Sequence, residues 1–306
     1  MLELAASSLL TPAILCFVLG AVAVFVRSDL RLPEPIVAAL SIYLMLALGL
    51  KGGVELVGRS LDELAAPIAA ALFLGCAIPL WCFALLRRYA GLGVADAAAM
   101  AAHYGSVSAV TFAAATTLLD QSAIPFEGYA PALLAIMEIP AIVVAIALAG
   151  FAALASRAEV NRSGAAVLVG GRGSGPGPDL SNVIADAFTS KSVLLLGGGL
   201  AIGALIGPQG LTSVKPLFVD LFPGLLCLFL LELGRLAASR IADFRQVGMK
   251  LGLFAIAMPV VHAALGIGLA HASGLSQGGA IILGTLAASA SYIAAPAAVL
   301  LALPEA

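Results

Sequence analysis

Charge is scarce in this sequence of 306 residues: 10% of them are Asp, Glu, Lys or Arg, whereas 62% are hydrophobic. A soluble globular domain has about 25% charged residues and is about half apolar, so the composition excludes an ordinary soluble protein. Stretches such as ALFLGCAIPLWCFALL run too long without charge to be strands of a buried parallel sheet. The formal net charge of −2 gives no indication of nucleic-acid binding. We therefore expect an all-α polytopic membrane protein.

Cysteines and catalytic motifs are also scarce. Cys16, Cys76, Cys82 and Cys227 lie within apolar runs and share no ligand spacing with histidine, so neither a disulfide framework nor a metal site is predicted. The glycines of VGGRGSGPG lack the strand–helix context and the Lys-Ser/Thr ending of a phosphate loop. No nucleophile elbow occurs either, so the sequence predicts neither an enzyme nor an organic cofactor. Because Glu3 precedes the first apolar stretch and no basic region does, we interpret that stretch as a first span, not a signal peptide.

A helix needs about 20 apolar residues to cross the hydrocarbon core of a membrane. On that length we predict nine spans, at 8–26, 35–50, 64–86, 94–118, 129–155, 190–207, 216–238, 249–272 and 278–303. The second of these is short, and the fourth and ninth are rich in Gly, Ser, Thr and Ala. Neither of these two is therefore expected to be a simple rod exposed to lipid.

The one long polar stretch lies between the fifth and sixth spans and is rich in Gly, Pro and Ser, which predicts a flexible linker. We therefore expect a first membrane repeat at 1–155, a linker at 156–189 and a second membrane repeat at 190–306.

The basic residues predict the orientation, because Lys and Arg accumulate on cytoplasmic loops. With the N-terminus outside, only Lys51, Arg59 and Lys215 of the 15 Lys and Arg residues fall on the outer side, and the linker is cytoplasmic. The first half has five spans, so the second half starts from the opposite side and is expected to be an inverted repeat. We expect a multi-pass protein of the plasma membrane, here the bacterial inner membrane.

A Ser-x-Ser pair followed by small residues occurs at the matching place in each half: Ser106/Ser108 in GSVSAVT and Ser289/Ser291 in AASASYIAAPAA. Small residues can serve close helix packing alone, with their hydroxyls bonded to the preceding turn. One such segment would favour that interpretation. Two matched segments in opposed halves instead favour the midplane site of a secondary transporter, where two interrupted helices point their N-termini at an anion.

A helix that breaks inside a membrane exposes backbone groups that only protein, water or a ligand can satisfy. Small residues leave room for close backbone approach, and a proline removes an N–H group. The predicted substrate-binding residues are Gly105, Ser106, Ser108, Thr111, Ser289 and Ser291, with Pro296 as a structural break. Together they predict a cradle for a small anion.

Ionisable residues within spans are costly and therefore informative. Glu138 lies in the middle of the fifth span and is our candidate for the carboxylate of a cation site, together with the hydroxyls of Ser108 and Ser291. No metal other than sodium is expected.

The other intramembrane polar residues have structural interpretations. Glu232 and Arg235 lie three residues apart on one helical face and are expected to pair with each other. His103 and His262 are expected to be hydrogen-bonded within the bundle, in preference to a direct role as ligands or proton relays. Asp96 is expected at the start of the fourth helix, where an acid complements the helix dipole.

Several sequence blocks in the same order resemble the sodium-dependent bicarbonate transporter family of the cyanobacterial type. They include GGVELVGRSLDELAAP, YGSVSAVTFAAATTLLDQSAI, MEIPAIV and AASASYIAAP. The resemblance implies two inverted five-helix repeats with crossing interrupted helices, a core domain that moves against a scaffold domain, and a homotrimer. It also implies that bicarbonate lies at the crossing, held by backbone amides and serines, with sodium beside it. A PII-like cytoplasmic protein that acts near the linker is implied as a regulatory partner.

The chain departs from the family pattern in two respects. Tyr292, Ala294 and Ala295 stand where family members have an acidic residue and further serines, and Ala109-Val110 replaces a Gly-Ser. The printed sequence also stops after the ninth span, so the tenth helix of the second repeat is expected to be missing from it.

The leading hypothesis is a secondary-active transporter that imports bicarbonate, or a similar small monovalent anion, with sodium as the coupling ion. A second hypothesis is cation/proton antiport, in which Glu138 and a histidine titrate. A third is a transporter-like receptor or scaffold that binds a ligand without flux and signals through the linker.

Overall fold

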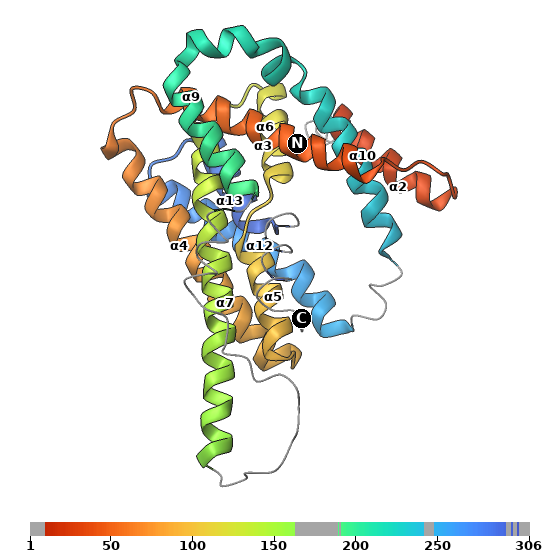
Figure 1. The fold of residues 1–306 in the computed structure, drawn as a ribbon, viewed down its shortest axis with the longest axis vertical. Helices are drawn as coiled ribbons and strands as arrows, with labels where there is room; N and C mark the ends of the chain where they lie inside the picture. Colours follow the sequence, from red (N-terminus) through yellow and green to blue (C-terminus); the bar gives the residue numbers. More distant parts are fainter. Residues whose placement is uncertain are drawn as a thin grey trace.

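The structure, a computed structural model, describes residues 10–162, 189, 191–241, 248–291, 295 and 299. All regular elements of this part are helical (Figure 1). The longer helices are α3 (Glu34–Leu56), α4 (Leu61–Leu85), α7 (Ala130–Arg162), α9 (Lys191–Lys215), α10 (Phe222–Ser239) and α12 (Met249–Ala272). The shorter ones are α2 (Pro12–Phe25), α5 (Val94–Gly105), α6 (Ala109–Gln121) and α13 (Gln277–Ala288), and two π-helical turns, η1 (Leu86–Ala90) and η2 (Pro216–Asp220), extend α4 and α9.

Five helical segments of the described residues are long and apolar enough to cross a membrane. Large apolar side chains remain exposed on their outer faces. On α12, Met249, Leu253, Ile256 and Val260 recur every three or four residues and are 66% to 88% exposed. Such a stripe is suited to lipid and not to water. The prediction of an all-α polytopic membrane protein is confirmed.

The predicted spans at 8–26, 64–86 and 249–272 agree with α2, α4 and α12 to within about four residues, and α12 begins and ends where the sequence predicted. The boundary between the spans at 190–207 and 216–238 differs, because α9 continues across a kink at Gly207 to Lys215 and α10 begins at Phe222.

The prediction of a short second span is wrong: α3 has 23 residues and continues to Leu56. The sequence suggested an end at Lys51 because a charge in lipid is costly, but Lys51 and Glu55 line a cavity between helices. Helix α7 continues to Arg162, within the range predicted as linker. Residues 163–188 of that linker lie outside the described residues.

Glycines bring α3 and α9 into close contact along a Gly-x3-Gly spacing in both helices. The motif on α3 is Gly49 with Gly53, and the motif on α9 is Gly199 with Gly203. A Cβ on Gly49 would lie 2.7 Å from the carbonyl oxygen of Leu196, and a Cβ on Gly53, Gly199 or Gly203 would also collide with the facing backbone. In a membrane, where lipid is as apolar as leucine, this close packing is a main source of helix association.

Helices α2 and α10 pack by the same device and lie side by side in Figure 1. A Cβ on Gly20 would overlap the carbonyl oxygen of Leu231, and a Cβ on Gly234 would overlap that of Phe17. The first helix of one half thus packs on the second helix of the other half, and the reverse holds for α9 and α3. An exchange of partners of this kind is what an inverted repeat requires, although the repeat itself stays a prediction.

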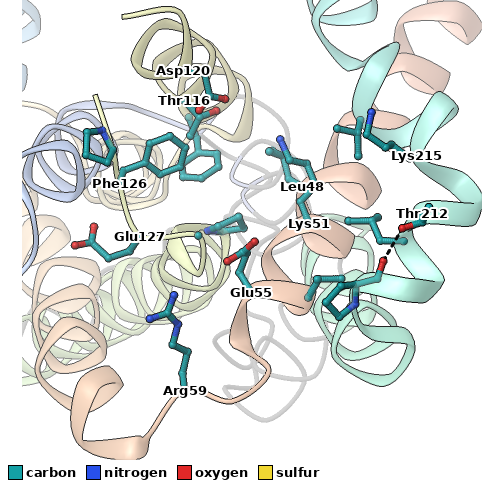
Figure 2. A pocket seen from close by; sticks show the side chains of 18 of the residues that line it. Leu48, Lys51, Glu55, Arg59, Thr116, Asp120, Phe126, Glu127, Thr212 and Lys215 are labelled. Carbon is teal, nitrogen blue, oxygen red and sulfur yellow. Dashed lines mark hydrogen bonds between the residues drawn. The ribbon is translucent and has the colours of Figure 1, made fainter. Parts of the chain in front are cut away.

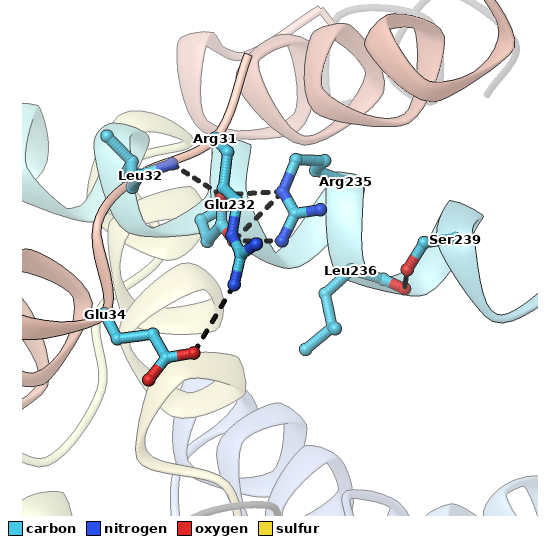
Figure 3. Close-up of polar contacts among 7 residues, drawn as sticks. All are labelled: Arg31, Leu32, Glu34, Glu232, Arg235, Leu236 and Ser239. Atoms are coloured by element: carbon cyan, nitrogen blue, oxygen red, sulfur yellow. Dashed lines mark hydrogen bonds and ion pairs between the residues drawn. The ribbon is translucent and has the colours of Figure 1, made fainter. Parts of the chain in front are cut away.

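A partly buried ion pair fixes the α2–α3 loop to α10 (Figure 3). Arg235 Nε lies 3.0 Å from both carboxylate oxygens of Glu232, and the Leu32 N–H donates to Glu232 Oε2 at 3.2 Å. Arg31 pairs with Glu34 at 3.4 Å beside it. The predicted pairing of Glu232 with Arg235 is confirmed, and its role is to hold the turn that precedes α3.

Candidate functional site

The fourth predicted span is interrupted at its Ser-x-Ser pair. Helix α5 ends at Gly105, and α6 begins at Ala109. Ser106 and Ser108 adopt extended backbone conformations, with φ −83° and ψ 151° for the first and φ −106° and ψ 111° for the second. The Ser108 hydroxyl then accepts a hydrogen bond from the Thr111 N–H at 3.1 Å, which makes Ser108 the N-cap of α6. The serine that the sequence singled out is therefore what starts the second half-helix.

The ninth predicted span breaks in the same way. Helix α13 ends at Ala288, and Ser289 is extended, with φ −77° and ψ 167°. The Ser291 hydroxyl accepts from the Ala295 N–H at 3.3 Å, and Ala295 and Val299 are again helical. The predicted break residue Pro296, like Tyr292, lies outside the described residues.

The two breaks meet, and each Ser-x-Ser pair hydrogen-bonds to the other. The Ser108 N–H donates to Ser289 Oγ at 3.0 Å, and the Ser291 N–H donates to the Ser106 carbonyl at 3.1 Å. In both bonds the second serine of one pair donates to the first serine of the other. We name residues 106–108 and 289–291 together the serine crossing.

His103 strengthens the serine crossing. Its Nδ1 lies 2.7 Å from the Ser291 carbonyl oxygen and therefore donates to it, while the His103 carbonyl accepts from the Ser291 N–H at 2.9 Å. His262, on α12, accepts from Trp81 Nε1 at 2.8 Å. The prediction that both histidines are hydrogen-bonded within the bundle is confirmed.

Gly105 allows three helices to converge at the first break. A Cβ on Gly105 would lie 2.7 Å from Pro79 Cδ on α4 and 2.9 Å from Ala141 Cβ on α7. No other residue type fits this position without movement of these helices. The predicted role of Gly105, close approach of backbone, agrees with this geometry.

Two hydroxyls of the serine crossing keep hydrogen-bonding capacity that the described residues do not use. Ser106 is fully buried, and its hydroxyl has no hydrogen-bond partner among the described residues. Ser108 Oγ accepts from Thr111 twice, from the N–H at 3.1 Å and from Oγ1 at 2.9 Å, which leaves its own proton available for donation. An unpaired buried hydroxyl costs about 1–3 kcal/mol. Such groups suit an oxyanion as donors and a small cation as lone-pair ligands.

Glu138 lies on α7, one helical turn before the Ala141 contact with the first break. It is 3% exposed, and the Ser192 hydroxyl of α9 lies within interaction range of its carboxyl group. Neither Ser192 Oγ nor Glu138 Oε2 completes a hydrogen bond within the described part of the chain, and the same holds for the buried hydroxyl of Ser41 on α3.

Ser41 is thus a further buried hydroxyl on α3, the helix that packs along α9. We name Glu138 and Ser192 together the Glu138 cluster.

The sequence pattern therefore predicted the position of both helix breaks. It also predicted that Glu138 binds the cation together with Ser108 and Ser291, but it did not predict the residues that surround Glu138. The structure brings Gly105, Ser106, Ser108, Thr111, Ser289 and Ser291 together, and it gives Glu138 a polar neighbour on α9. Ser192 and Ser41 carry no local sequence signal, because isolated serines in apolar helices are common. Only their burial without partners distinguishes them.

Helix content, hydropathy and the joined helix breaks define a multi-pass membrane protein. Residues 12–306 match the profile of the Na+-dependent bicarbonate transporter superfamily, a range that includes both breaks. The chain belongs to this family, and the resemblance predicted from the sequence blocks is confirmed. The comparison with curated proteins gave no match. Membership makes the chain a membrane transporter by family, with sodium as the ion on which the family depends.

Proposed function

We propose that this chain imports bicarbonate, or a similar small monovalent anion, with inward sodium as the coupling ion. The observation that supports the proposal is the reciprocal hydrogen bonding at the serine crossing. It joins the start of α6 to the point where the chain becomes helical again after Ser291. Helix N-termini carry partial positive charge and free N–H groups, and two of them at one place favour an anion.

A bound sodium ion lowers the electrostatic free energy needed to move an anion through a low-dielectric region. A cation that travels with the anion cancels its charge, and hydroxyl, carbonyl and carboxylate oxygens are the ligands that hard cations prefer. We assign Glu138 the role of the coupling-ion carboxylate, with the neighbouring Ser192 hydroxyl beside it, and we keep Ser108 and Ser291 as hydroxyls shared with the anion site. Alternating access then follows as rigid movement of one helix group against another.

The placement in the cell follows from the charge pattern and the resemblance. We propose that the N-terminus is outside the bacterial inner membrane, that the 156–189 linker is cytoplasmic, and that the protein is a homotrimer regulated by a PII-like partner. The basic residues support the orientation, and the family resemblance supports the assembly.

The test is uptake of radiolabelled bicarbonate into proteoliposomes, with and without an inward sodium gradient. We expect accumulation only with the gradient. The variants Ser108→Ala and Ser291→Ala are expected to weaken the apparent affinity for bicarbonate at least tenfold while the yield of folded protein stays similar, because each removes one hydroxyl at the crossing.

Other outcomes would contradict the proposal in specific ways. Pulses of internal pH change that need sodium but no bicarbonate would indicate cation/proton antiport. Saturable binding of an anion without flux would indicate a receptor. Normal bicarbonate uptake in both serine variants would remove the serine crossing as the site.

A further inference from the structure

A cavity of about 620 Å³ lies between α3, α6, the α6–α7 loop and α9 (Figure 2). It opens on the side that carries the loops after α3 and α6, which the charge pattern predicts to be the outer side. Its charged lining residues are Lys51, Glu55, Arg59, Asp120, Glu127 and Lys215. We name this cavity the vestibule.

The vestibule collects every basic residue that the sequence predicts on the outer side. These are Lys51, Arg59 and Lys215, and all of them line it. Basic residues on the outer side run against the usual charge distribution of membrane proteins. Because all three line one cavity, we infer that they serve that cavity and are not unrelated surface charges.

Two of the three basic residues are paired with acids. Lys215 forms an ion pair with Asp220, and Arg59 lies 3.9 Å from Glu63. Lys51, by contrast, forms no ion pair with any carboxylate in the described ranges, and its ammonium lies 5.6 Å from the centre of the Phe222 ring. Lys51 is thus the basic residue whose charge is left to act on the vestibule.

Lys51 also lies nearest to the floor of the vestibule. The floor is apolar: Leu48 of α3 and Phe112 of α6 line it and are 3% and 1% exposed. Phe112 follows Ser108 by four residues, so the floor stands one helical turn above the serine crossing on the same face of α6. Lys51 comes three residues after Leu48.

The acids of the vestibule lie further from its floor. Glu55 lies about 6 Å beyond Lys51 along α3, and Asp120 lies about 12 Å beyond the floor residue Phe112 along α6. Glu127 lies on the α6–α7 loop and accepts a hydrogen bond from the Ser276 N–H at 2.6 Å. These three acids form no ion pair within the described residues, so the outer part of the vestibule is acidic, and Lys51 is the charged residue closest to the floor above the serine crossing.

The volume shows how such a charge would act. A cavity of 620 Å³ holds the equivalent of about 20 water molecules at about 30 Å³ each. An ion of bicarbonate size would keep most of its hydration there. Salt would screen the attraction of such an ion to Lys51 only in part, because the Debye length of about 8–10 Å is comparable to the size of a cavity of this volume.

We propose that the vestibule is the outer access chamber for the transported oxyanion, and that Lys51 is the residue that draws the anion to its floor above the serine crossing. This inference rests on the proposed function. It assigns Lys51 to capture of the anion and leaves the tight binding step to the crossing.

The first experiment measures the electrostatic effect without transport. Thr212 is exposed, lines the vestibule and donates only to Pro208 of its own helix, so Thr212→Cys is a mild reporter. We would compare its labelling rates with an anionic and a cationic methanethiosulfonate of similar size, and subtract the rate of the parent chain with its four cysteines. Lys51→Met is expected to lower the anionic-to-cationic rate ratio about three- to tenfold, and Lys51→Arg is expected to retain it. Lys191→Met, which removes an exposed lysine elsewhere, is the matched control and is expected to change nothing.

The second experiment measures bicarbonate uptake in cells, where only the outer face meets the substrate. Lys51→Met is expected to raise the KM for bicarbonate about three- to tenfold at low ionic strength, with an unchanged maximal rate and an unchanged sodium requirement. High salt is expected to reduce the difference between the variant and the parent chain.

The two experiments separate this inference from the proposed function. An unchanged labelling ratio or an unchanged KM in Lys51→Met, in a parent chain that transports bicarbonate, overturns the role of Lys51 and leaves the proposed function intact. A parent chain that transports no bicarbonate overturns the proposed function, and the role of Lys51 in capture falls with it. A fall in maximal rate with an unchanged KM would show that Lys51 supports the structure and not capture.

Discussion

The glycine contacts of α3 with α9 and the serine crossing hold helices together by different interactions. Where α3 meets α9 neither helix is broken, and glycines let the two backbones touch, while the kink of α9 at Gly207 lies beyond this contact. At the serine crossing the helices are broken, and the exposed backbone groups are satisfied by the other break. The first contact rests on direct packing of backbone against backbone. The second keeps a buried hydroxyl on Ser106 that has no partner in the described part of the chain, and such a group can bind a ligand.

This difference indicates which side chains can be substituted without loss of stability. A glycine in a backbone contact has no freedom to accept a side chain, whereas a hydroxyl with no partner can be removed without loss to the fold. The comparison therefore predicts effects of opposite sign on stability and on transport in the two regions.

The largest effect is expected at the glycine contact. Gly53→Ala would place a methyl group against the Leu200 carbonyl oxygen, and overpacking of this kind costs about 1–3 kcal/mol because backbone cannot move aside easily. Thermal unfolding in detergent is expected to show a clear loss of stability. Gly198→Ala is the matched control on α9, since a Cβ there meets nothing within 4 Å, and it is expected to be neutral or stabilising. Equal melting temperatures for the two variants would contradict the close packing of α3 on α9.

The next largest effect on stability is expected where the two breaks join. Ser289→Ala removes the acceptor of the half-buried Ser108 N–H, and the lost hydrogen bond costs about 0.5–1.5 kcal/mol. Thermal unfolding measures the loss, and Ser289→Thr, which keeps the hydroxyl, is the control for it. If both variants unfolded like the parent chain, the breaks would not depend on each other.

Substitutions in the Glu138 cluster test whether its buried polar groups bind the coupling ion. Glu138→Gln keeps the shape of the side chain and removes its charge, so the sodium concentration for half-maximal uptake is expected to rise at least tenfold, about 1.4 kcal/mol. Ser192→Ala is expected to act in the same direction with a smaller change. The control is Glu34→Gln, whose carboxyl group is 88% exposed at the start of α3. Sodium dependence that is the same in all three variants would place the coupling ion elsewhere.

The smallest effect on stability is expected at Ser106. Ser106→Ala removes a buried hydroxyl that has no partner in the described part, so the melting temperature is expected to stay the same or rise slightly, by no more than about 1 kcal/mol in unfolding free energy. Bicarbonate affinity is nevertheless expected to fall. A destabilised Ser106→Ala protein would show that the hydroxyl serves the fold and not a ligand.

Much of this architecture could be predicted from local patterns. Apolar length predicted the helices, and the Ser-x-Ser pairs predicted the place of both breaks, because serine caps a new helix start and small residues permit close approach. The length of α3 could not be predicted, since the sequence does not show that Lys51 and Glu55 face a water-accessible cavity. The polar neighbour of Glu138 could not be predicted either, because Ser192 is 54 residues away from it in the chain.

By itself the sequence determined that the chain enters a membrane and where two of its apolar segments break. These are properties of single segments, set by hydropathy and by the hydrogen bonds that a residue can make with its own neighbours. Only the tertiary structure decided that the two breaks bond to each other, that glycines of α3 meet glycines of α9, and that the outer basic residues share one vestibule. Such pairings depend on which distant surfaces pack together, and that choice is made by the whole set of contacts in the folded chain.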